Sequence, residues 1–570
     1  MRGTEGYDYV IVGAGSAGCV LADRLTEDGS ASVLLVEAGG WDRDPFIKIP
    51  IGWGRLMQKR LHDWGYDTEP DAALGGRTME CTRGRVIGGS SSINAMAYVR
   101  GNPGDYDRWA GYGLPGWSYA HVLPYFKRQE RWQDGESLYR GGSGPLSTVR
   151  ASYRDPLSAA CLEAADSAGF PRTDDYNGAR QEGFGILQST IGKGRRCSAA
   201  DAYLRPALGR ANLTVATGAL VTGIAFEGER AVAVEYRRGG RARKAAARRE
   251  IILCAGTMNT PQILMLSGIG DPAELARHGI RTRVALPGVG ANLQDHLTVA
   301  VEFRRRESGP FVHHMRADRL LAGLGQAYLR GTGFATDLPS GWTAFLRTPL
   351  AGALPDIQLI FRAVPMAAAP WFPGVRKPFE DGFAVRAVLV RPESRGRVAL
   401  RSADPADKIM IRQNLLSAGR DRAVMRAALR LIRELAAQPA LRRYIGAELA
   451  PGEANWSDAG LDRHIDRYAA TAHHPAGTCR MGGGDDPGLV LDPAFRVRGT
   501  AGLRVVDASA FPDLVGGNIN APVLMMAEKA ADLILGREPP APIAARTQAR
   551  TNTQRQYQDQ GKKKMESAHP

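Results

Sequence analysis

Several residue types and segments are scarce or absent in this chain of 570 residues, and each absence excludes a class of protein. The six cysteines are scattered and form no CxxC pair, so neither a disulfide framework nor a metal site is expected. No run approaches the roughly 18 consecutive apolar residues of a membrane span. No apolar signal segment precedes the first strand-like run. These absences favour a globular protein of the cytoplasm, without a transmembrane segment.

Lysine is also scarce, because only 11 of the 74 basic residues are lysine, although the net charge is +15. The densest basic run, residues 237–249, holds seven basic residues in thirteen and lies between two strand-like segments. It contains no aromatic residue on which a base could stack, so we interpret it as a solvated hairpin and expect no nucleic-acid partner. A weak peripheral association with an anionic membrane surface stays open.

Glycine, in contrast, is abundant, with 68 copies against an expected share of ~7%. Three of them form Gly13-x-Gly15-x-x-Gly18, directly after the apolar run 7–12 and before a helix-like stretch. A second apolar run, 32–36, ends at Glu37. In this pattern the glycines permit a tight turn and close approach of a pyrophosphate, and the acid accepts hydrogen bonds from ribose hydroxyls. The order of these elements predicts a dinucleotide site, and the loop alone leaves NAD and FAD open.

The remaining chain shows two kinds of sequence pattern. One resembles the N-terminus, with short apolar strands and helices. It includes strand-like runs at 213–226, 231–236, 250–254 and 504–507 and helices at 256–266 and 522–535. Residues 300–465 are richer in aromatics and alternating strands, such as 383–390. The last residues, 537–570, are polar and predict a disordered tail.

Five ordered motifs make the chain resemble the glucose–methanol–choline (GMC) flavoprotein oxidoreductases over residues ~5–536. These five motifs, which come in addition to the glycine loop, are residues 84–96, 256–270, 474–482, 506–512 and 518–522. The resemblance implies an α/β fold with a Rossmann-like FAD-binding domain and a discontinuous α+β substrate-binding domain. We assign 1–150, 195–300 and 466–536 to the first and 151–194 and 301–465 to the second. Within the family the chain looks most like the bacterial alcohol, choline and sorbose dehydrogenases.

The resemblance also implies which residues contact the FAD. A histidine stands at the position of Ile93 in covalent members of the family, so isoleucine there predicts non-covalent FAD. The expected cofactor residues are Gly13, Gly15, Ser16, Ala17, Gly18, Glu37, Ala38, Arg85, Gly88, Gly89, Ser90, Asn94, Ala95, Met96, Ala97, Val221, Ala255, Gly256, Asp507, Ala508, Pro522 and Val523.

Alcohol oxidation requires a base with a pKa near neutrality beside the substrate hydroxyl, which favours histidine. Of the adjacent His473 and His474, the family's catalytic histidine stands directly before the proline, which selects His474. Asn520 matches the second catalytic position, where an amide would hold the substrate oxygen as negative charge develops. Asn518 is the competing assignment, and the register to the following helix favours Asn520.

The expected reaction is therefore FAD-dependent oxidation of a primary or secondary alcohol to an aldehyde or ketone. The substrate is not identified, because a choline site would need an aromatic cage and a carboxylate that the sequence does not locate. The electron acceptor, a quinone, a cytochrome or O2, is open, and we favour a dehydrogenase over an oxidase by family analogy. A redox-silent lyase that keeps FAD structurally is a further alternative.

Overall fold

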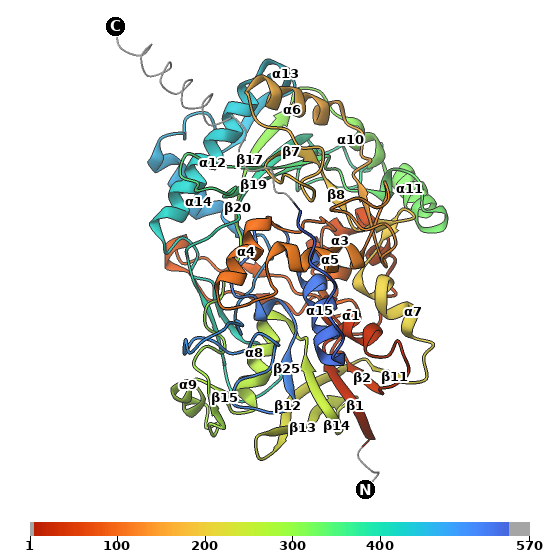
Figure 1. Ribbon diagram of the computed structural model, residues 1–570. Coiled ribbons are helices and arrows are strands. Elements are labelled where there is room, and N and C mark those ends of the chain that lie inside the picture. Colours follow the sequence, from red (N-terminus) through yellow and green to blue (C-terminus); the bar gives the residue numbers. More distant parts are fainter. Residues whose placement is uncertain (1–4, 546–570) are drawn as a thin grey trace.

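The computed structural model describes residues 5–545, and two seven-stranded sheets dominate it. Figure 1 shows them one above the other. The lower sheet is built from the first part of the chain and from β25 (Leu503–Val505), and the upper sheet from residues 183–471.

The lower sheet has the order β11-β2-β1-β14-β13-β12, with β25 also paired to β14. The strands β11 (Leu213–Ala216), β2 (Val33–Val36), β1 (Glu5–Val12), the end of β14 (Arg241–Leu253) and β25 run parallel. All four residues of β2 are buried, as a parallel sheet covered on both faces requires. The helices α1 (Ser16–Arg24) and α15 (Asn520–Leu535) lie side by side against this sheet (Figure 1).

Two sequence predictions meet different outcomes in this sheet. The basic segment is confirmed as a solvated hairpin, because β13 (Arg230–Arg238) turns at Gly239 and Gly240 into β14 and its basic side chains are exposed. The single strand expected at 213–226 is wrong. It is two strands, β11 and β12 (Ala219–Glu227), at opposite ends of the path, and Gly218, with φ +63°, makes the break.

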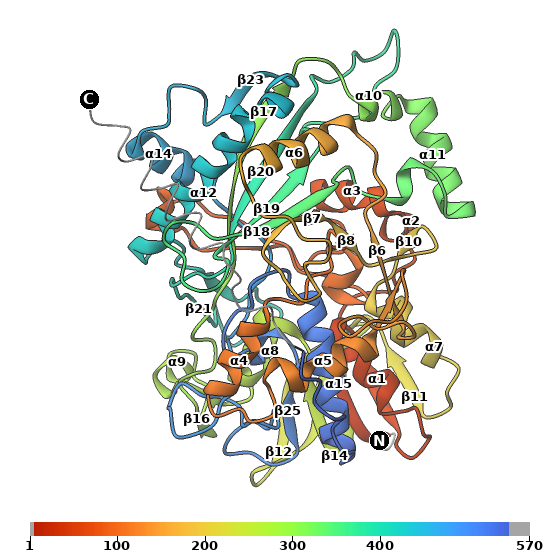
Figure 2. The ribbon, with the colours of Figure 1, turned by 45° about the horizontal axis from the view of Figure 1, so that its top comes forward.

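The upper sheet is antiparallel, with the order β23-β17-β20-β19-β18-β7. Its central strands are β17 (Leu297–Arg305), β20 (Gly382–Leu389) and β19 (Ile357–Arg362). On one face, side chains such as Val299, Val385 and Leu359 pack in a core with α12 (Gly419–Ala437) and α6 (Pro156–Ser167). Figure 2 shows these two helices flanking the strands. The alternate residues face the lower sheet, because successive side chains of a strand point to opposite faces.

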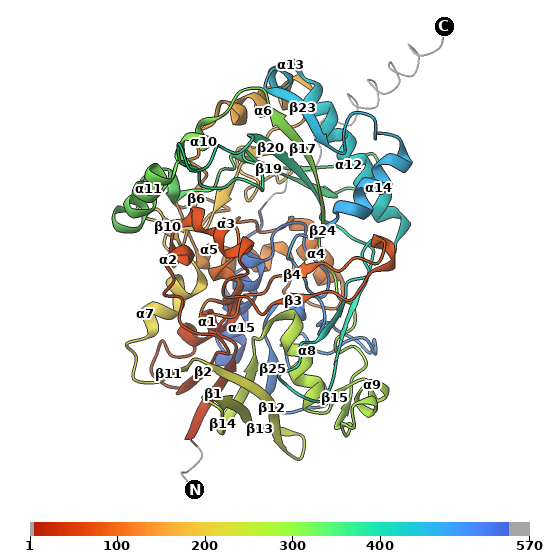
Figure 3. The ribbon, with the colours of Figure 1, turned by 180° about the vertical axis from the view of Figure 1, so that it is seen from behind.

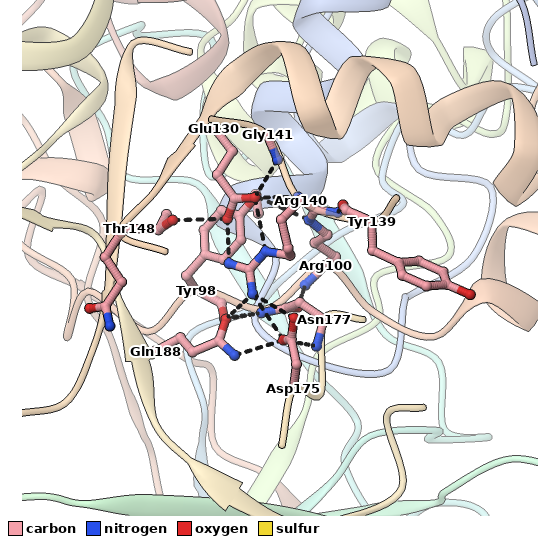
Figure 4. Close-up of polar contacts among 12 residues, drawn as sticks. Tyr98, Arg100, Glu130, Tyr139, Arg140, Gly141, Thr148, Asp175, Asn177 and Gln188 are labelled. Carbon is pink, nitrogen blue, oxygen red and sulfur yellow. Dashed lines mark hydrogen bonds and ion pairs between the residues drawn. The ribbon is translucent and has the colours of Figure 1, made fainter. Parts of the chain in front are cut away.

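Short segments fill the space between the two sheets. Figure 3 shows β3 (Tyr66–Asp67) and β4 (Glu80–Cys81) there, close to β24 (Ala470–Thr471). A buried ion-pair network lies at the end of α5 (Tyr119–Gln129; Figure 4). In it the carboxylate of Glu130 accepts hydrogen bonds from Arg100, Arg140 and Thr148. Burial alone would raise the pKa of Glu130, but the two guanidinium charges hold it below its ordinary value.

The domain boundaries given above stay a prediction. At the C-terminal side, residues 537–545 form no helix or strand, and the backbone N–H of Ile543 donates to the carbonyl of Ala120 in α5. The rest of the expected tail, 546–570, lies outside the described residues. Among residues 5–545, no helix is both long and apolar enough to cross a membrane.

Candidate active site

A cavity of about 690 Å³ lies between the two sheets. At one end it is lined by the glycine loop, by Glu37 and Ala38 after β2, and by Val221 of β12; we call this the dinucleotide end. At the other end it is lined by the cavity-facing residues of β17, β19 and β20, which we call the substrate wall. His474 and Asn518 line the same cavity. One continuous space therefore connects the predicted cofactor residues with the predicted catalytic residues.

The glycine loop is shaped by close backbone contacts. A Cβ at Gly18 would lie 1.9 Å from the carbonyl oxygen of Gly13, and a Cβ at Gly89 would lie 2.7 Å from the Cα of Gly15. Gly88 and Gly89 both have positive φ values, of +85° and +54°. Any side chain at Gly18 or Gly89 would displace the backbone that faces the cavity, which explains why glycine stands there.

Two helix N-termini meet at the cavity. Ser16 begins α1 and Asn520 begins α15, and the Ser16 hydroxyl donates to the Asn520 side-chain oxygen over 2.7 Å. Neither helix has a side chain that caps its first N–H groups. Uncapped N–H groups and the positive end of the helix dipole form a site for an anion such as a pyrophosphate.

Glu37 is buried and is held by the backbone. Its two carboxylate oxygens accept from the N–H of Ala14 at 2.9 Å and of Gly39 at 2.7 Å. Burial raises its pKa, although these hydrogen bonds oppose the shift. Each oxygen keeps a second lone pair for a ligand hydroxyl. Together with the glycine loop and the helix ends, this arrangement fits the adenosine and pyrophosphate parts of FAD.

Most of the predicted cofactor residues line the cavity. They are Gly13, Gly15, Ser16, Ala17, Glu37, Ala38, Gly89, Ser90, Asn94, Ala95, Met96, Ala97, Val221, Ala255, Gly256, Asp507, Ala508 and Val523. The structure does not place Gly18, Arg85, Gly88 or Pro522 in the lining. Gly18 packs against Gly13, and Arg85 is exposed, with its guanidinium over the ring of Trp64.

Asp507 lines the cavity and also holds neighbouring backbone in place. Its Oδ2 accepts from the N–H of Gly256 at 2.9 Å and from the Thr260 hydroxyl at 2.6 Å, and its Oδ1 accepts from Ser509. Gly256 is the first residue of α8 (Gly256–Leu266). Asp507 therefore ties the start of α8 to the loop after β25, at the edge of the cavity.

His474, which lines the cavity, makes two polar contacts through its ring nitrogens. Its Nε2 lies 3.0 Å from the side-chain nitrogen of Asn518, and its Nδ1 lies 3.0 Å from Nδ1 of His296. The Asn518 oxygen in turn accepts from Gln358 at 3.4 Å. The competing asparagine is thus the one beside His474. The expected Asn520 also lines the cavity, but its side-chain oxygen accepts from Ser16, because Asn520 is the first residue of α15 and its side chain is directed at α1.

The orientation of the Asn518 amide is assigned from its other contact, because its oxygen accepts from Gln358. With this assignment the amide nitrogen donates to Nε2 of His474, and the His474 proton is placed on Nδ1, directed at His296. The pKa of His474 lies well below its ordinary value, mainly because burial disfavours the imidazolium and then because His296, Arg83 and His473 lie nearby. His474 is therefore a neutral imidazole near pH 7, with a lone pair on Nε2.

A strained turn orients His474. His473 has a φ of +63°, and its carbonyl accepts from Arg83 at 2.7 Å. The backbone N–H of His474 donates to Asp295 at 2.9 Å, and the other oxygen of Asp295 accepts from Gln413 and Thr471. Burial raises the pKa of Asp295 to about 6. Asp295 and His296, which the sequence reasoning missed, stand immediately before β17, and this polar pair ahead of an apolar strand was the available signal.

Comparison with known proteins identifies the family. Residues 7–298 match the N-terminal domain and residues 392–527 the C-terminal domain of GMC oxidoreductases. The chain belongs to the GMC oxidoreductase family. It is 44% identical over 547 residues to an oxygen-dependent choline dehydrogenase of Photobacterium profundum, covering 95% of both chains. It is 45% identical over 536 residues to one of Brucella anthropi, covering 93% of this chain and 96% of the other.

Solved structures of GMC relatives agree in fold. Pyridoxine 4-oxidase of Mesorbium loti has a TM-score of 0.83 at 34% identity, covering 93% of this chain and 99% of that one. A formate oxidase of Aspergillus oryzae has a TM-score of 0.84 at 28% identity, covering 93% and 98%. The chain is thus an FAD-dependent oxidoreductase that acts on CH–OH groups, with a Rossmann-like FAD domain and a substrate domain, as the sequence predicted.

Proposed function

We propose that this enzyme oxidises a small alcohol to an aldehyde or ketone, with His474 as the base and Asn518 as the group that holds the substrate oxygen. The observation that carries the proposal is the contact of 3.0 Å between a neutral His474 and Asn518 at the wall of the FAD cavity. Asn518 replaces Asn520 in the proposed pair.

The first step is removal of the hydroxyl proton. The substrate hydroxyl takes the place of the Asn518 N–H at Nε2 of His474 and gives its proton to that nitrogen. The resulting imidazolium keeps its Nδ1–H on His296, so no other proton has to move. The imidazolium and the Asn518 amide then both donate to the alkoxide oxygen, which stabilises the charge that develops there. When bound, FAD supplies the two-electron acceptor for the hydride of the alcohol carbon.

The residues that would hold FAD follow from the site. The N-termini of α1 and α15 would take the pyrophosphate, Glu37 the ribose, and the loop of Gly88 and Gly89 the ring system. Ile93 is buried beside Val86 and lines the cavity, and its side chain has no atom that could bond to a flavin. We therefore propose non-covalent FAD, which acid denaturation followed by ultrafiltration tests, since the yellow colour should leave the protein.

The decisive experiment is anaerobic flavin reduction by a panel of alcohols. His474→Gln should keep bound FAD and lose about 1000-fold or more of the reduction rate. An unchanged rate would refute the assignment of the base. A wild-type flavin that no alcohol bleaches would favour the redox-silent lyase instead. Repeating the turnover with O2, a quinone or a cytochrome as the sole oxidant separates an oxidase from a dehydrogenase.

A further inference from the structure

The charge of the cavity lining is uneven. Among the described residues its only carboxylates are Glu37 and Asp507, and both belong to the dinucleotide end or the start of α8. The cations Arg83, Arg362 and Arg386 line the cavity on the side of the catalytic pair. Among the described residues, the lining on the substrate side therefore holds cations and no carboxylate.

Of these three arginines, Arg386 is the one whose side chain has no polar partner. It lies on β20 between Ala300 of β17 and Ile360 of β19, and its side chain faces the cavity. Within residues 5–545 its guanidinium makes no hydrogen bond and no ion pair. The acid nearest in this part of the sheet is Glu302, and its carboxylate already pairs with Arg362 at 3.6 Å. Two guanidinium groups thus share one carboxylate, and a net charge of +1 remains on the substrate wall.

An unpaired guanidinium in a partly buried place is costly, because it stays charged at all physiological pH values and has lost part of its hydration. Its planar set of N–H donors matches a carboxylate, which it binds through two parallel hydrogen bonds. The anion that would compensate Arg386 is not part of the described protein, so a ligand is the remaining source.

The distance between Arg386 and the pair of His474 and Asn518 sets the separation between the two polar groups of that ligand. Val388, two residues further along β20, lies opposite Gln358, and Gln358 is hydrogen-bonded to Asn518. Two residues of a strand span about 7 Å. Thr298, opposite Val388, lines the cavity and has a buried hydroxyl without a hydrogen-bond partner. An alcohol whose hydroxyl lies at His474 can therefore place a second polar group, a few carbons away, at Arg386.

The opposite side of the cavity is apolar. Phe311 and Met315 of the segment around α10 (Pro310–His314) and Leu320 and Leu324 of α11 (Ala317–Arg330) line it. This lining suits the carbon chain between the two polar ends of the ligand.

We propose that the substrate is an alcohol that carries a carboxylate on a short apolar chain, and that Arg386 binds this carboxylate. The inference rests on the proposed function of His474 and Asn518. It separates this chain from the choline dehydrogenases that it resembles, because a quaternary ammonium group would meet an unpaired guanidinium of like charge and no carboxylate. Arg386 is then the residue that determines specificity.

The test compares alcohols of similar shape that differ in charge. Anaerobic flavin reduction is measured with 4-hydroxybutanoate and 6-hydroxyhexanoate, with 1-hexanol as the uncharged chain, and with choline against its uncharged isostere 3,3-dimethylbutan-1-ol. The hydroxy acids should exceed 1-hexanol in kcat/KM, and choline should fall below its isostere. Arg386→Gln should lower kcat/KM for the hydroxy acids by about 30- to 100-fold, mainly through KM, and change 1-hexanol by less than about threefold.

Arg55→Gln is the matched control, since Arg55 of α3 (Trp53–Gln58) also lines the cavity but does not belong to the substrate wall; its effect on the hydroxy acids should be much smaller. An equal loss for hydroxy acids and 1-hexanol in Arg386→Gln would overturn the proposal and assign Arg386 to the reaction itself. A wild-type preference for choline over its isostere would overturn it as well.

Binding of hexanoate, which has no hydroxyl, gives a readout independent of turnover. Calorimetry on the holoenzyme should show binding that weakens about 30-fold or more in Arg386→Gln. An unchanged Kd refutes the carboxylate site even if alcohols are oxidised. If hexanoate binds as expected but no alcohol reduces the flavin, the proposed function fails while the carboxylate site stands.

Discussion

The side-chain nitrogen of Asn518 lies 3.0 Å from Nε2 of His474, whereas Asn520, two residues later, is hydrogen-bonded to Ser16. The difference arises at the start of α15, which begins at Asn520. Asn518 still belongs to the loop and can reach across the cavity, while Asn520 is already fixed by the helix. The two asparagines therefore have different partners, and we propose a role in chemistry for Asn518 and a role in holding two helix ends together for Asn520.

Replacing each asparagine by alanine tests this division. Asn518→Ala should lower the rate of anaerobic flavin reduction by about 10²- to 10³-fold, because it removes a donor to the developing alkoxide. Asn520→Ala should leave that rate within about threefold and weaken FAD retention, because it loosens the contact between α1 and α15. The reverse ranking of the two rates would return the catalytic role to Asn520.

The rate of flavin reduction should depend on pH through His474. Only the neutral imidazole can accept the hydroxyl proton, and burial sets the pKa of His474 well below 6.5. The rate should therefore be independent of pH above neutrality and fall only on the acid side, with a midpoint below 6.5. Stopped-flow reduction from pH 5 to 9 measures it, and an acid limb centred above pH 7 would contradict the neutral, buried imidazole.

Stability should fall with pH in acid because buried imidazoles cannot take up protons. Burial lowers the pKa of His473 to about 3, so between pH 6.5 and 3 the unfolded chain binds a proton that the folded chain does not. At pH 5 this costs on the order of 2 kcal/mol. His473→Asn keeps a residue that tolerates the φ of +63°.

Comparing the wild type with His473→Asn cancels the contribution of the other titratable groups to the pH dependence of stability. Asp295, with a pKa raised to about 6, takes up a proton on folding and opposes the trend in both. The drop in Tm from pH 7 to pH 5 should be smaller in His473→Asn than in the wild type. Equal drops would show that His473 does not titrate as its burial implies.

The buried network in Figure 4 should be essential for stability. Glu130→Gln leaves Arg100 and Arg140 with one fewer negative charge in a site from which water is excluded, and should destabilise the protein by about 3 kcal/mol. Glu136→Gln is the control, since Glu136 pairs with Lys127 at the surface, where such pairs contribute little. Similar melting temperatures for the two variants would contradict the role of the network.

Much of the fold could be predicted because its signals are local. The apolar run before Gly13, the acid at Glu37 and the helix after Gly256 are each encoded within a few residues, and their order indicates a dinucleotide fold. The strand expected at 213–226 failed for a non-local reason, since its two halves pair with different strands of the sheet. Periodicity describes a segment, and sheet pairing depends on distant partners.

The sequence by itself determined the family and the FAD cofactor, and it singled out His474 as the candidate base, because the motifs are contiguous and their chemistry can be recognised residue by residue. The tertiary structure decided which asparagine meets that histidine and that His296 contacts its second nitrogen. It also decided that the Arg386 side chain faces the cavity, without a polar partner among residues 5–545. His296 and His474, for example, are 178 positions apart in the sequence. Charge balance and hydrogen-bond direction depend on distances in space, which only the folded chain sets.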